Sequence, residues 1–207
     1  MSESVFESFE AYLKGADYPK GKKKIMQAAV DLISTKSYNG TSTLQIAKHA
    51  GLSQATLFKY FKTKEDLLTA ILHPVVPGLF GRFFEELLAL ETTEEKVHYL
   101  VQNRMAYLKT NRALMKIILQ EIFSNKKLRK EQLYFWNTLQ DKLLVLHKEL
   151  IADSRVNPEL TIPQMVRLCV GPLLGYFAQL YIVGDKGDIR EEDLDLLEKQ
   201  ILGGLWK

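Results

Sequence analysis

The stretch from Thr41 to Leu68 constrains the fold of this chain more than any other part of it. It reads as a short helix, a turn at Gly51, a second short helix and the beginning of a third. Glycine tolerates the positive φ with which many helices end. Ser42 or Thr43 can cap the first helix. The apolar residues expected to face inward from this helix are Leu44, Ile46 and Ala47.

Ser53 is placed to cap the second helix, which we predict over residues 54–60. Leu57 and Phe61 are four residues apart, so both can point inward from one face. The opposite face is polar and consists of Gln54, Thr56, Lys59 and Tyr60. Two helices joined by a tight glycine turn, the second short and polar on its outer face, are typical of proteins that place a helix in the major groove of DNA.

At these residues the chain resembles the TetR family of bacterial transcriptional regulators. The positions that match the family pattern are Thr41, Ser42, Ile46, Ala47, Ala50, Gly51, Ser53, Thr56, Leu57, Tyr60, Phe61, Lys64, Glu65 and Leu67. Two positions depart from it: Ala55 replaces the usual glycine, and Phe58 stands where a tyrosine often reaches a phosphate. The second departure removes a hydroxyl contact with the DNA backbone, so it is expected to weaken DNA binding without changing the preference for particular base sequences.

The resemblance implies a set of DNA-contacting residues. The groove-facing set is Gln54, Ala55, Thr56, Lys59 and Tyr60, and the phosphate contacts are Ser42, Thr43 and Lys64. A glutamine can pair with adenine through two hydrogen bonds, and a lysine can reach a guanine or a phosphate. The expected partner is therefore a double-stranded DNA operator, with no catalytic residue, metal or cofactor.

The charge distribution supports a nucleic-acid partner for the N-terminal part. The formal net charge is +3, but residues 20–64 contain nine lysines and one acidic residue, a balance of +8 that leaves −5 for the rest. A basic end on an acidic remainder suits contact with a polyanion. A lysine-rich helix start that is merely solvated would give the same composition.

We predict an all-α chain with three parts: an N-terminal extension (1–19), a three-helix helix-turn-helix DNA-binding domain (20–68), and a helical-bundle regulatory body for ligand binding and dimerisation (69–207). The extension carries a weak apolar stripe and could be an extra helix or a mobile arm. Pro74, Pro77 and Gly78 predict a break or kink between residues 72 and 78, after which helix resumes to about Leu90.

The last two predicted helices, about 164–183 and 189–203, are the expected interface of a two-fold homodimer. The first is apolar on nearly every side, so one chain can cover only part of it. Gly171, Gly175 and Ala178 would permit close approach of a partner helix. The family resemblance implies the same dimer, and an ordinary core without a partner is the alternative.

The resemblance also implies a pocket for an unknown small-molecule effector in the body. Aromatic residues that could line it are Phe83, Tyr107, Trp136 and Tyr176. Apolar residues at helical spacing more often form a packed core than a cavity, so plain packing is the alternative for each of them.

Other functional classes have weaker support. Glu94 and His98 lie four residues apart and could hold a metal, but a third ligand at a diagnostic spacing is lacking, and a surface pair is favoured. No nucleophile elbow, Walker loop or dinucleotide fingerprint is present, which argues against an enzyme. An architectural DNA-binding protein without a ligand would share the DNA-binding domain.

Cysteine usage and hydropathy indicate the compartment. The single cysteine, Cys169, excludes an internal disulfide, so a reducing cytoplasm is the expected setting. Residues 1–20 have no apolar run typical of a signal peptide. The charge-free stretch from Leu168 to Ala178 is too short to span a bilayer. Together these features predict a cytoplasmic regulator, expected to be a repressor that a ligand releases from a pseudo-palindromic operator.

Overall fold

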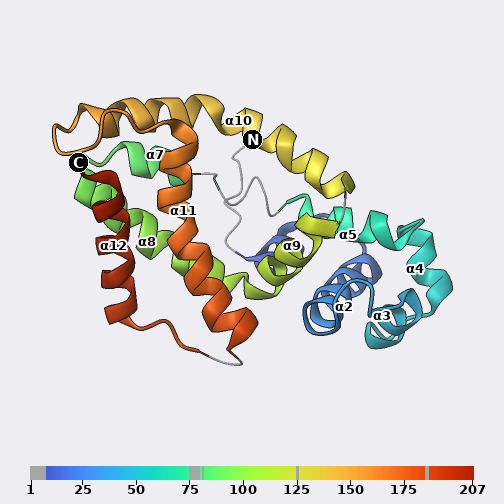
Figure 1. The fold of residues 1–207 in the computed structure, drawn as a ribbon. Coiled ribbons are helices and arrows are strands. Elements are labelled where there is room, and N and C mark those ends of the chain that lie inside the picture. Colours follow the sequence, from blue (N-terminus) through green and yellow to red (C-terminus); the bar gives the residue numbers. More distant parts are fainter. Residues whose placement is uncertain (1–7, 75–79, 81, 125, 185–186) are drawn as a thin grey trace. The chain divides into compact units, whose positions relative to one another are not determined.

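The computed structural model describes residues 8–74, 80, 82–124, 126–184 and 187–207, without the side chains of residues 122–138 (Figure 1). Within these ranges every regular element is helical, and the β-structure is limited to one isolated bridge between Val156 and Trp206. The predicted all-α class is therefore confirmed. The chain forms two compact units, residues 1–81 with 110–135 and residues 82–109 with 136–207.

The first unit is built around α2 (Lys20–Lys36), which packs against α3 (Thr43–His49), α4 (Gln54–Tyr60), α5 (Lys64–Leu72) and α9 (Arg112–Ser124). Apolar residues of α2 form much of the core of this unit, and Ile25, Ala29 and Ile33 are completely inaccessible to solvent. An amphipathic stripe of this width stabilises a helix through tertiary burial rather than through intrinsic propensity.

Side-chain caps fix where the short helices begin. The Ser42 hydroxyl accepts from the Gln45 backbone N–H at 3.2 Å, while the Gln45 side chain accepts from the Ser42 N–H at 2.8 Å. Ser53 caps α4 by accepting from the Thr56 N–H at 3.1 Å. These bonds satisfy backbone donors that a helix start leaves without partners. The predicted bounds of α4, residues 54–60, are confirmed.

One predicted inward position on α3 is wrong. Leu44 is 60% exposed, whereas Ile46 and Ala47 are completely buried. Successive helical residues are separated by about 100°, so Leu44 and Ile46 project to nearly opposite sides and cannot share a buried face. Leu57 and Phe61 are buried as predicted.

The N-terminal extension contains a helix, α1 (Phe9–Gly15), within the first unit. Ser8 caps it by accepting from the Ala11 N–H at 3.1 Å, and Phe9 and Leu13 are buried. The extra-helix alternative therefore holds for this part of residues 1–19. Because α9 also joins the first unit, that unit contains more of the chain than the predicted domain of residues 20–68, whose boundaries stay a prediction.

The predicted break after the DNA-binding domain begins where α5 ends, at Leu72. Pro74 lies just beyond this end, and because proline has no backbone N–H it cannot continue the hydrogen-bond pattern of α5. Pro77 and Gly78 lie outside the described residues, so a kink there stays a prediction. Helix is described again as α7, Phe83–Leu88.

The second unit contains α7, α8 (Thr93–Thr110), the C-terminal part of α10 (Lys126–Ala152), α11 (Ile162–Ala178), the π-helix η1 (Gln179–Val183) and α12 (Glu191–Leu205). Helix α11 begins two residues before the predicted start because Pro163 fits the first helical turn, where its missing N–H has no intrahelical partner. α11 packs against α12, and Phe177 and Ile201 are completely buried.

Residues 162–183 form a continuous helical stretch of 22 residues, and the mean hydropathy of its most apolar 18-residue window is 1.5. By length and composition alone this stretch could cross a membrane. The expectation from the sequence rested only on the shorter charge-free segment from Leu168 to Ala178, which is too short to do so. Core helices of soluble proteins pass the same test. Only 28% of its most apolar window is buried in this chain, so the expected burial on every side is not achieved within one chain.

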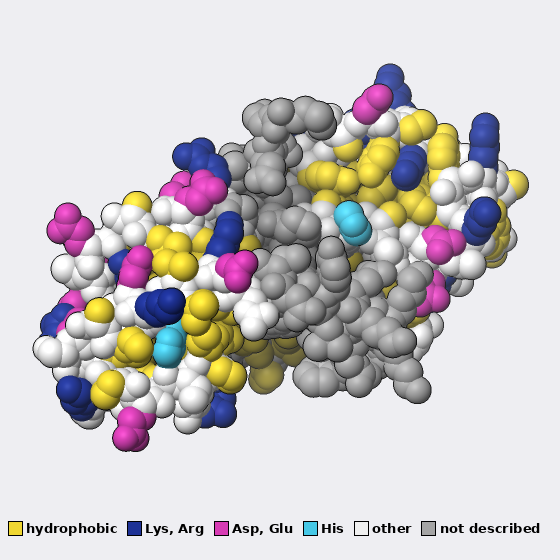
Figure 2. All heavy atoms as spheres, turned by 90° about the horizontal axis from the view of Figure 1, so that it is seen from above, with side chains coloured by type: hydrophobic (Ala, Val, Ile, Leu, Met, Phe, Trp, Pro, Cys, Tyr) yellow, Lys and Arg dark blue, Asp and Glu magenta, His cyan; other side chains and the backbone are white. Residues whose placement is uncertain are grey.

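Part of the exposed surface of this stretch is apolar and runs along α11. It contains Val170, Gly171, Leu174 and Gly175, and a Cβ atom added at either glycine would meet no atom within 4 Å. Leu196 of α12 is 52% exposed. The face of the molecule shown in Figure 2 mixes hydrophobic side chains with charges of both signs, as is ordinary for a folded protein. We define Val170, Gly171, Leu174, Gly175 and Leu196 as the apolar stripe.

Candidate DNA-binding interface

The turn between α3 and α4 has the geometry that the sequence predicts. Gly51 has a φ of +68° and is the one described glycine with a positive φ. The Leu52 N–H donates to the Ala47 carbonyl oxygen at 2.9 Å, which closes the end of α3. This tight connection sets α4 against α3 and α2 with Leu57 inward. The opposite face of α4 is left toward solvent.

Gln54 and Thr43 lie together although they belong to different helices. The Gln54 side-chain amide donates to the Thr43 hydroxyl at 2.9 Å. One amide N–H and the amide oxygen of Gln54 remain for a base edge, which is the pair that adenine recognition requires. The bond also connects a predicted groove contact to a predicted phosphate contact before DNA is bound.

The remaining groove-facing candidates are arranged unequally. Ala55 and Lys59 are exposed, while Thr56 is half-buried and shares a 2.9 Å hydrogen bond with the Ser53 hydroxyl. Tyr60 lies against the first turn of α2, where a Cβ added at Gly21 would approach its hydroxyl to 3.1 Å. Tyr60 is thus held beside the lysine-rich helix start. Phe58, which replaces a tyrosine of the family pattern, is 45% exposed.

Lys64, a predicted phosphate contact, is held within its own unit. Its ammonium donates to the Tyr38 carbonyl oxygen and lies 3.9 Å from the centroid of the Tyr38 ring. Partial burial lowers the pKa of Lys64, and the negative charge of Glu121 opposes this shift. A lysine positioned by a carbonyl and an aromatic face would have to leave these contacts to reach a phosphate.

Glu121 of α9 is the acidic residue that faces this lysine. It is only 6% exposed, and burial raises the pKa of its carboxyl group despite the attraction of Lys64. Neither Tyr38 nor Glu121 was predicted as part of this site. The sequence did contain a signal for Glu121. This residue follows Leu114 and Ile117 at helical spacing and therefore belongs to the buried face of α9.

Two of the predicted effector residues lie close to a third residue that was not predicted from the sequence. The Arg104 guanidinium is 4.0 Å from the Phe83 ring centroid and 5.3 Å from that of Tyr107. Phe83 and Tyr107 are both buried. Burial lowers the pKa of Arg104 to about 10, so this cation lies in a poorly solvated, aromatic environment.

Polar groups extend from this arginine. Arg104 Nε donates to the Asn103 side-chain oxygen at 3.2 Å, and Asn103 in turn donates to the Tyr99 hydroxyl at 2.9 Å. The Tyr99 hydroxyl donates to Glu86, and the Tyr99 ring stacks on Phe83. The candidate effector site therefore combines aromatic surfaces with one oriented cation.

The other two predicted effector residues, Tyr176 and Trp136, have no described contact with the residues around Arg104. The Tyr176 hydroxyl donates to Asp193 at 2.7 Å and belongs to the packing of α11 against α12. The side chain of Trp136 lies outside the described residues. Both assignments stay predictions.

Glu94 and His98, the two candidate metal ligands, each contact a different residue. Glu94 is paired with Arg155, and His98 Nδ1 lies 2.9 Å from Glu198. In the described part of the chain, no group of three or more His, Cys, Asp or Glu residues could hold a metal ion. The structure therefore places Glu94 and His98 in separate contacts, with the loop after α10 and with α12 respectively.

The geometry of α3 and α4 agrees with comparisons to known proteins. Residues 25–71 match the family model described as "Bacterial regulatory proteins, tetR family". These residues are a TetR-family DNA-binding domain. The TetR domain, as we call residues 25–71 below, includes every groove-facing candidate and every phosphate-contact candidate.

Curated relatives match different shares of this chain. The fatty acid metabolism regulator protein of Bacillus subtilis is 29% identical over 85 residues, which are 41% of this chain and 44% of that protein. The chain thus spans less than half the length of that relative. The nucleoid occlusion factor SlmA of Mannheimia succiniciproducens is 22% identical over 175 residues, 81% of each chain.

Solved structures match over most of the chain and show its fold. PfmR of Thermus thermophilus, a TetR family transcriptional regulator, has a TM-score of 0.71 at 24% identity, covering 88% of this chain and 99% of that one. FadR of Bacillus subtilis in complex with stearoyl-CoA has a TM-score of 0.63 at 23% identity, covering 87% and 95%. The helices outside the TetR domain thus follow the same overall fold.

Proposed function

We propose that this protein is a homodimeric, sequence-specific DNA-binding transcriptional regulator of the cytoplasm. The observation that carries the proposal is the TetR domain itself, in which Gly51 turns the chain and α4 keeps Leu57 inward and its polar face outward. The excess of lysine in residues 20–64 would supply sequence-independent attraction to phosphates, and α4 would supply the base contacts.

The apolar stripe supports the homodimer. Val170 and Leu174 are each 37% exposed, and the open space beside Gly171 and Gly175 would let a partner helix approach closely. A two-fold axis at this stripe would bury the same apolar surface of both chains and present two α4 helices to two half-sites. Contiguous apolar exposure of this kind commonly marks a protein interface.

The site around Arg104 supports a response to a small molecule. A guanidinium close to two aromatic rings has the chemistry to suit a ligand with an anionic group and an apolar portion. The Bacillus subtilis FadR structure contains stearoyl-CoA, a molecule of this chemistry, which makes it a suitable first probe. Ligand binding would release the operator only through different affinity for the DNA-competent and DNA-incompetent states.

The proposal is tested by selecting bound sequences from random duplex DNA with the purified chain, then measuring affinity across a salt series. We expect a pseudo-palindromic site bound at least about a thousandfold more tightly than random DNA. Adding stearoyl-CoA to this complex then tests ligand release. Weak binding without sequence preference at every salt concentration would refute a sequence-specific regulator.

A second candidate is a DNA-binding protein that acts without a small-molecule effector. The observation behind it is that the match to a protein named as a nucleoid occlusion factor extends over 81% of this chain, whereas the match to one named as a fatty acid metabolism regulator extends over 41%. Both candidates require a specific site. The second would be supported if the selected duplex remained bound with a panel of acyl-CoA ligands and the protein showed no binding of them.

A further inference from the structure

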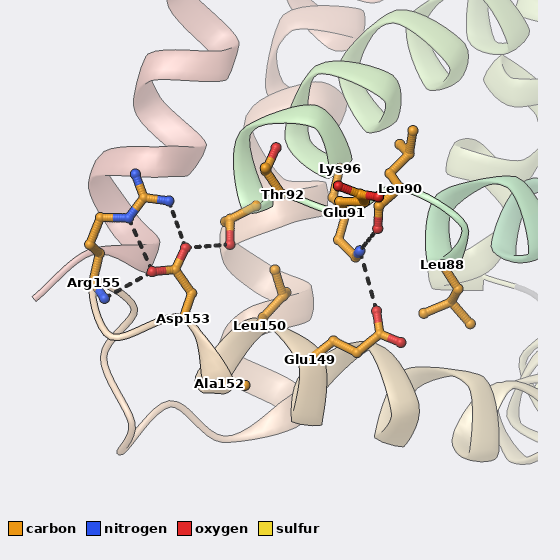
Figure 3. Close-up of a pocket in the computed structure, with 11 residues that line it drawn as sticks. Leu88, Leu90, Glu91, Thr92, Lys96, Glu149, Leu150, Ala152, Asp153 and Arg155 are labelled. Carbon is orange, nitrogen blue, oxygen red and sulfur yellow. Dashed lines mark hydrogen bonds and ion pairs between the residues drawn. The ribbon is translucent and has the colours of Figure 1, made fainter.

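The second unit contains a cavity that is separate from the residues around Arg104. It has a volume of about 570 Å³ and lies between the loop before α8 and the C-terminal end of α10 (Figure 3). Sites for small molecules commonly have volumes of about 300–1,000 Å³. Leucine side chains form part of the wall, namely Leu88, Leu90 and Leu150.

A nearly buried lysine provides the chemistry of this cavity. Lys96 is only 6% exposed, and its ammonium donates to the Leu90 carbonyl oxygen and pairs with Glu149 Oε2 at 3.3 Å (Figure 3). An ammonium group has three N–H donors. Among the residues that the structure describes, these two acceptors are the partners of Lys96, so one donor remains for an acceptor in the cavity.

Two other charged residues of the cavity, Asp153 and Arg155, are paired with each other. Asp153 accepts from Arg155 at 2.7 Å and from the Thr93 hydroxyl at 2.9 Å. Arg155 also donates to Glu94. Glu91 is exposed at the edge. The cation considered for a ligand is therefore Lys96, and its ion-pair partner is Glu149, whose side chain is 40% exposed.

We propose that this cavity binds a small monocarboxylate with a short apolar chain. The carboxylate would accept from Lys96, and the chain would lie against Leu88, Leu90 and Leu150. Glu149 would compete with the ligand for the same ammonium, because two carboxylates cannot pair equally well with one cation. This site does not depend on the proposed DNA binding and would persist if that proposal failed.

The test uses isothermal titration calorimetry of the full chain with hexanoate, hexylamine and hexanol. Hexanoate is expected to bind most tightly, and its binding should perturb the ¹⁵N–¹H NMR signals of residues 88–96 and 149–155. The Glu149→Gln variant keeps a hydrogen bond to Lys96 but removes the competing charge, so hexanoate should bind up to about fivefold more tightly. Glu198→Gln, which removes a carboxylate paired with His98 instead, should leave the affinity unchanged.

Lys96→Met should lower hexanoate affinity at least about tenfold, since it removes the ionic partner. If this variant does not fold, the relative affinities of the three ligands and the effect of Glu149→Gln on hexanoate affinity still test the proposal. Tighter binding of hexylamine than hexanoate, equal affinity in wild type and Glu149→Gln, or NMR perturbations away from the cavity would each overturn the proposal.

Discussion

Gln54 and Thr43 show how single residues prepare the DNA-binding surface. Their hydrogen bond, 2.9 Å long, restricts a flexible glutamine before it meets a base. Ordering a side chain in advance lowers the entropy lost on binding. Tyr60 is restricted in a similar way by its position beside Gly21. The surface therefore has fewer mobile side chains than its polar composition indicates.

Phe58 gives the first prediction at the residue scale. It is 45% exposed on α4 and lacks the hydroxyl with which the family's usual tyrosine reaches a phosphate. Phe58→Tyr should tighten binding to specific and random duplexes alike, by about threefold, the value of one added hydrogen bond. Fluorescence anisotropy with both duplexes measures this, with Phe58→Leu as the control. A gain confined to one sequence would contradict a phosphate contact.

Glu121 gives a second prediction, which concerns stability and pH. Burial raises the folded-state pKa of Glu121, so stability is lost as pH rises from the unfolded pKa of about 4.3 to the folded-state pKa, and the cost is absent at lower pH. Glu121→Gln should therefore raise the free energy of unfolding at pH 7.5 by on the order of 1 kcal/mol and change it little at pH 4.

Urea unfolding at the two pH values measures this difference. Glu65→Gln, which neutralises a half-exposed carboxylate of the same unit, serves as the control and should have a smaller effect. A lower stability of Glu121→Gln at pH 7.5 would show that attraction to Lys64 outweighs the cost of burial.

At the scale of elements, the connection between α3 and α4 rests on one backbone conformation. Gly51 has a φ of +68°, a conformation in which other residues are strained by roughly 1–2 kcal/mol. Gly51→Ala should destabilise the protein by about that amount although its Cβ would meet no atom within 4 Å. Thermal unfolding measures the loss.

Gly15→Ala is a matched control for this change, because Gly15 is the last residue of α1 and also has open space around the position of a Cβ. It lacks a positive φ, so alanine should be neutral or slightly stabilising there. Equal effects of the two substitutions would contradict a conformational requirement at Gly51.

The start of a helix could be predicted from the sequence wherever one local interaction determines it. Ser42 and Ser53 cap helices as predicted, because a cap depends on residues three positions away. The prediction that Leu44 faces inward is wrong because it relied on the apolar character of the residue and neglected its angular position around the helix. The contacts of Lys64 with Tyr38 and of Arg104 with Phe83 join residues 26 and 21 positions apart, respectively, so only the folded arrangement reveals them.

At the scale of the whole molecule, the exposed apolar surfaces of α11 and α12 require an explanation. A helix that is apolar on nearly all sides but largely uncovered in one chain would be costly in water. We expect a second copy of the chain to cover the apolar stripe. Leu174→Asp should therefore convert a dimer to a monomer, because it places a charge in the centre of a dry interface.

Size-exclusion chromatography with light scattering measures the mass of each species. Val145→Asp is the control, since Val145 is 45% exposed on α10 and lies outside the stripe. A wild-type protein that elutes as a monomer, or a Leu174→Asp variant that remains dimeric, would contradict the proposed interface.

The central claim is that α4 reads bases, and a base-by-base substitution scan of the selected duplex tests it most directly. Affinities of wild type and Gln54→Ala are measured for each single base-pair change. We predict that Gln54→Ala loses discrimination at one position in each half-site, by about 1–3 kcal/mol, and keeps it elsewhere. An equal loss of affinity for every duplex, with discrimination unchanged at all positions, would contradict base reading by Gln54 and by the face of α4 on which it lies.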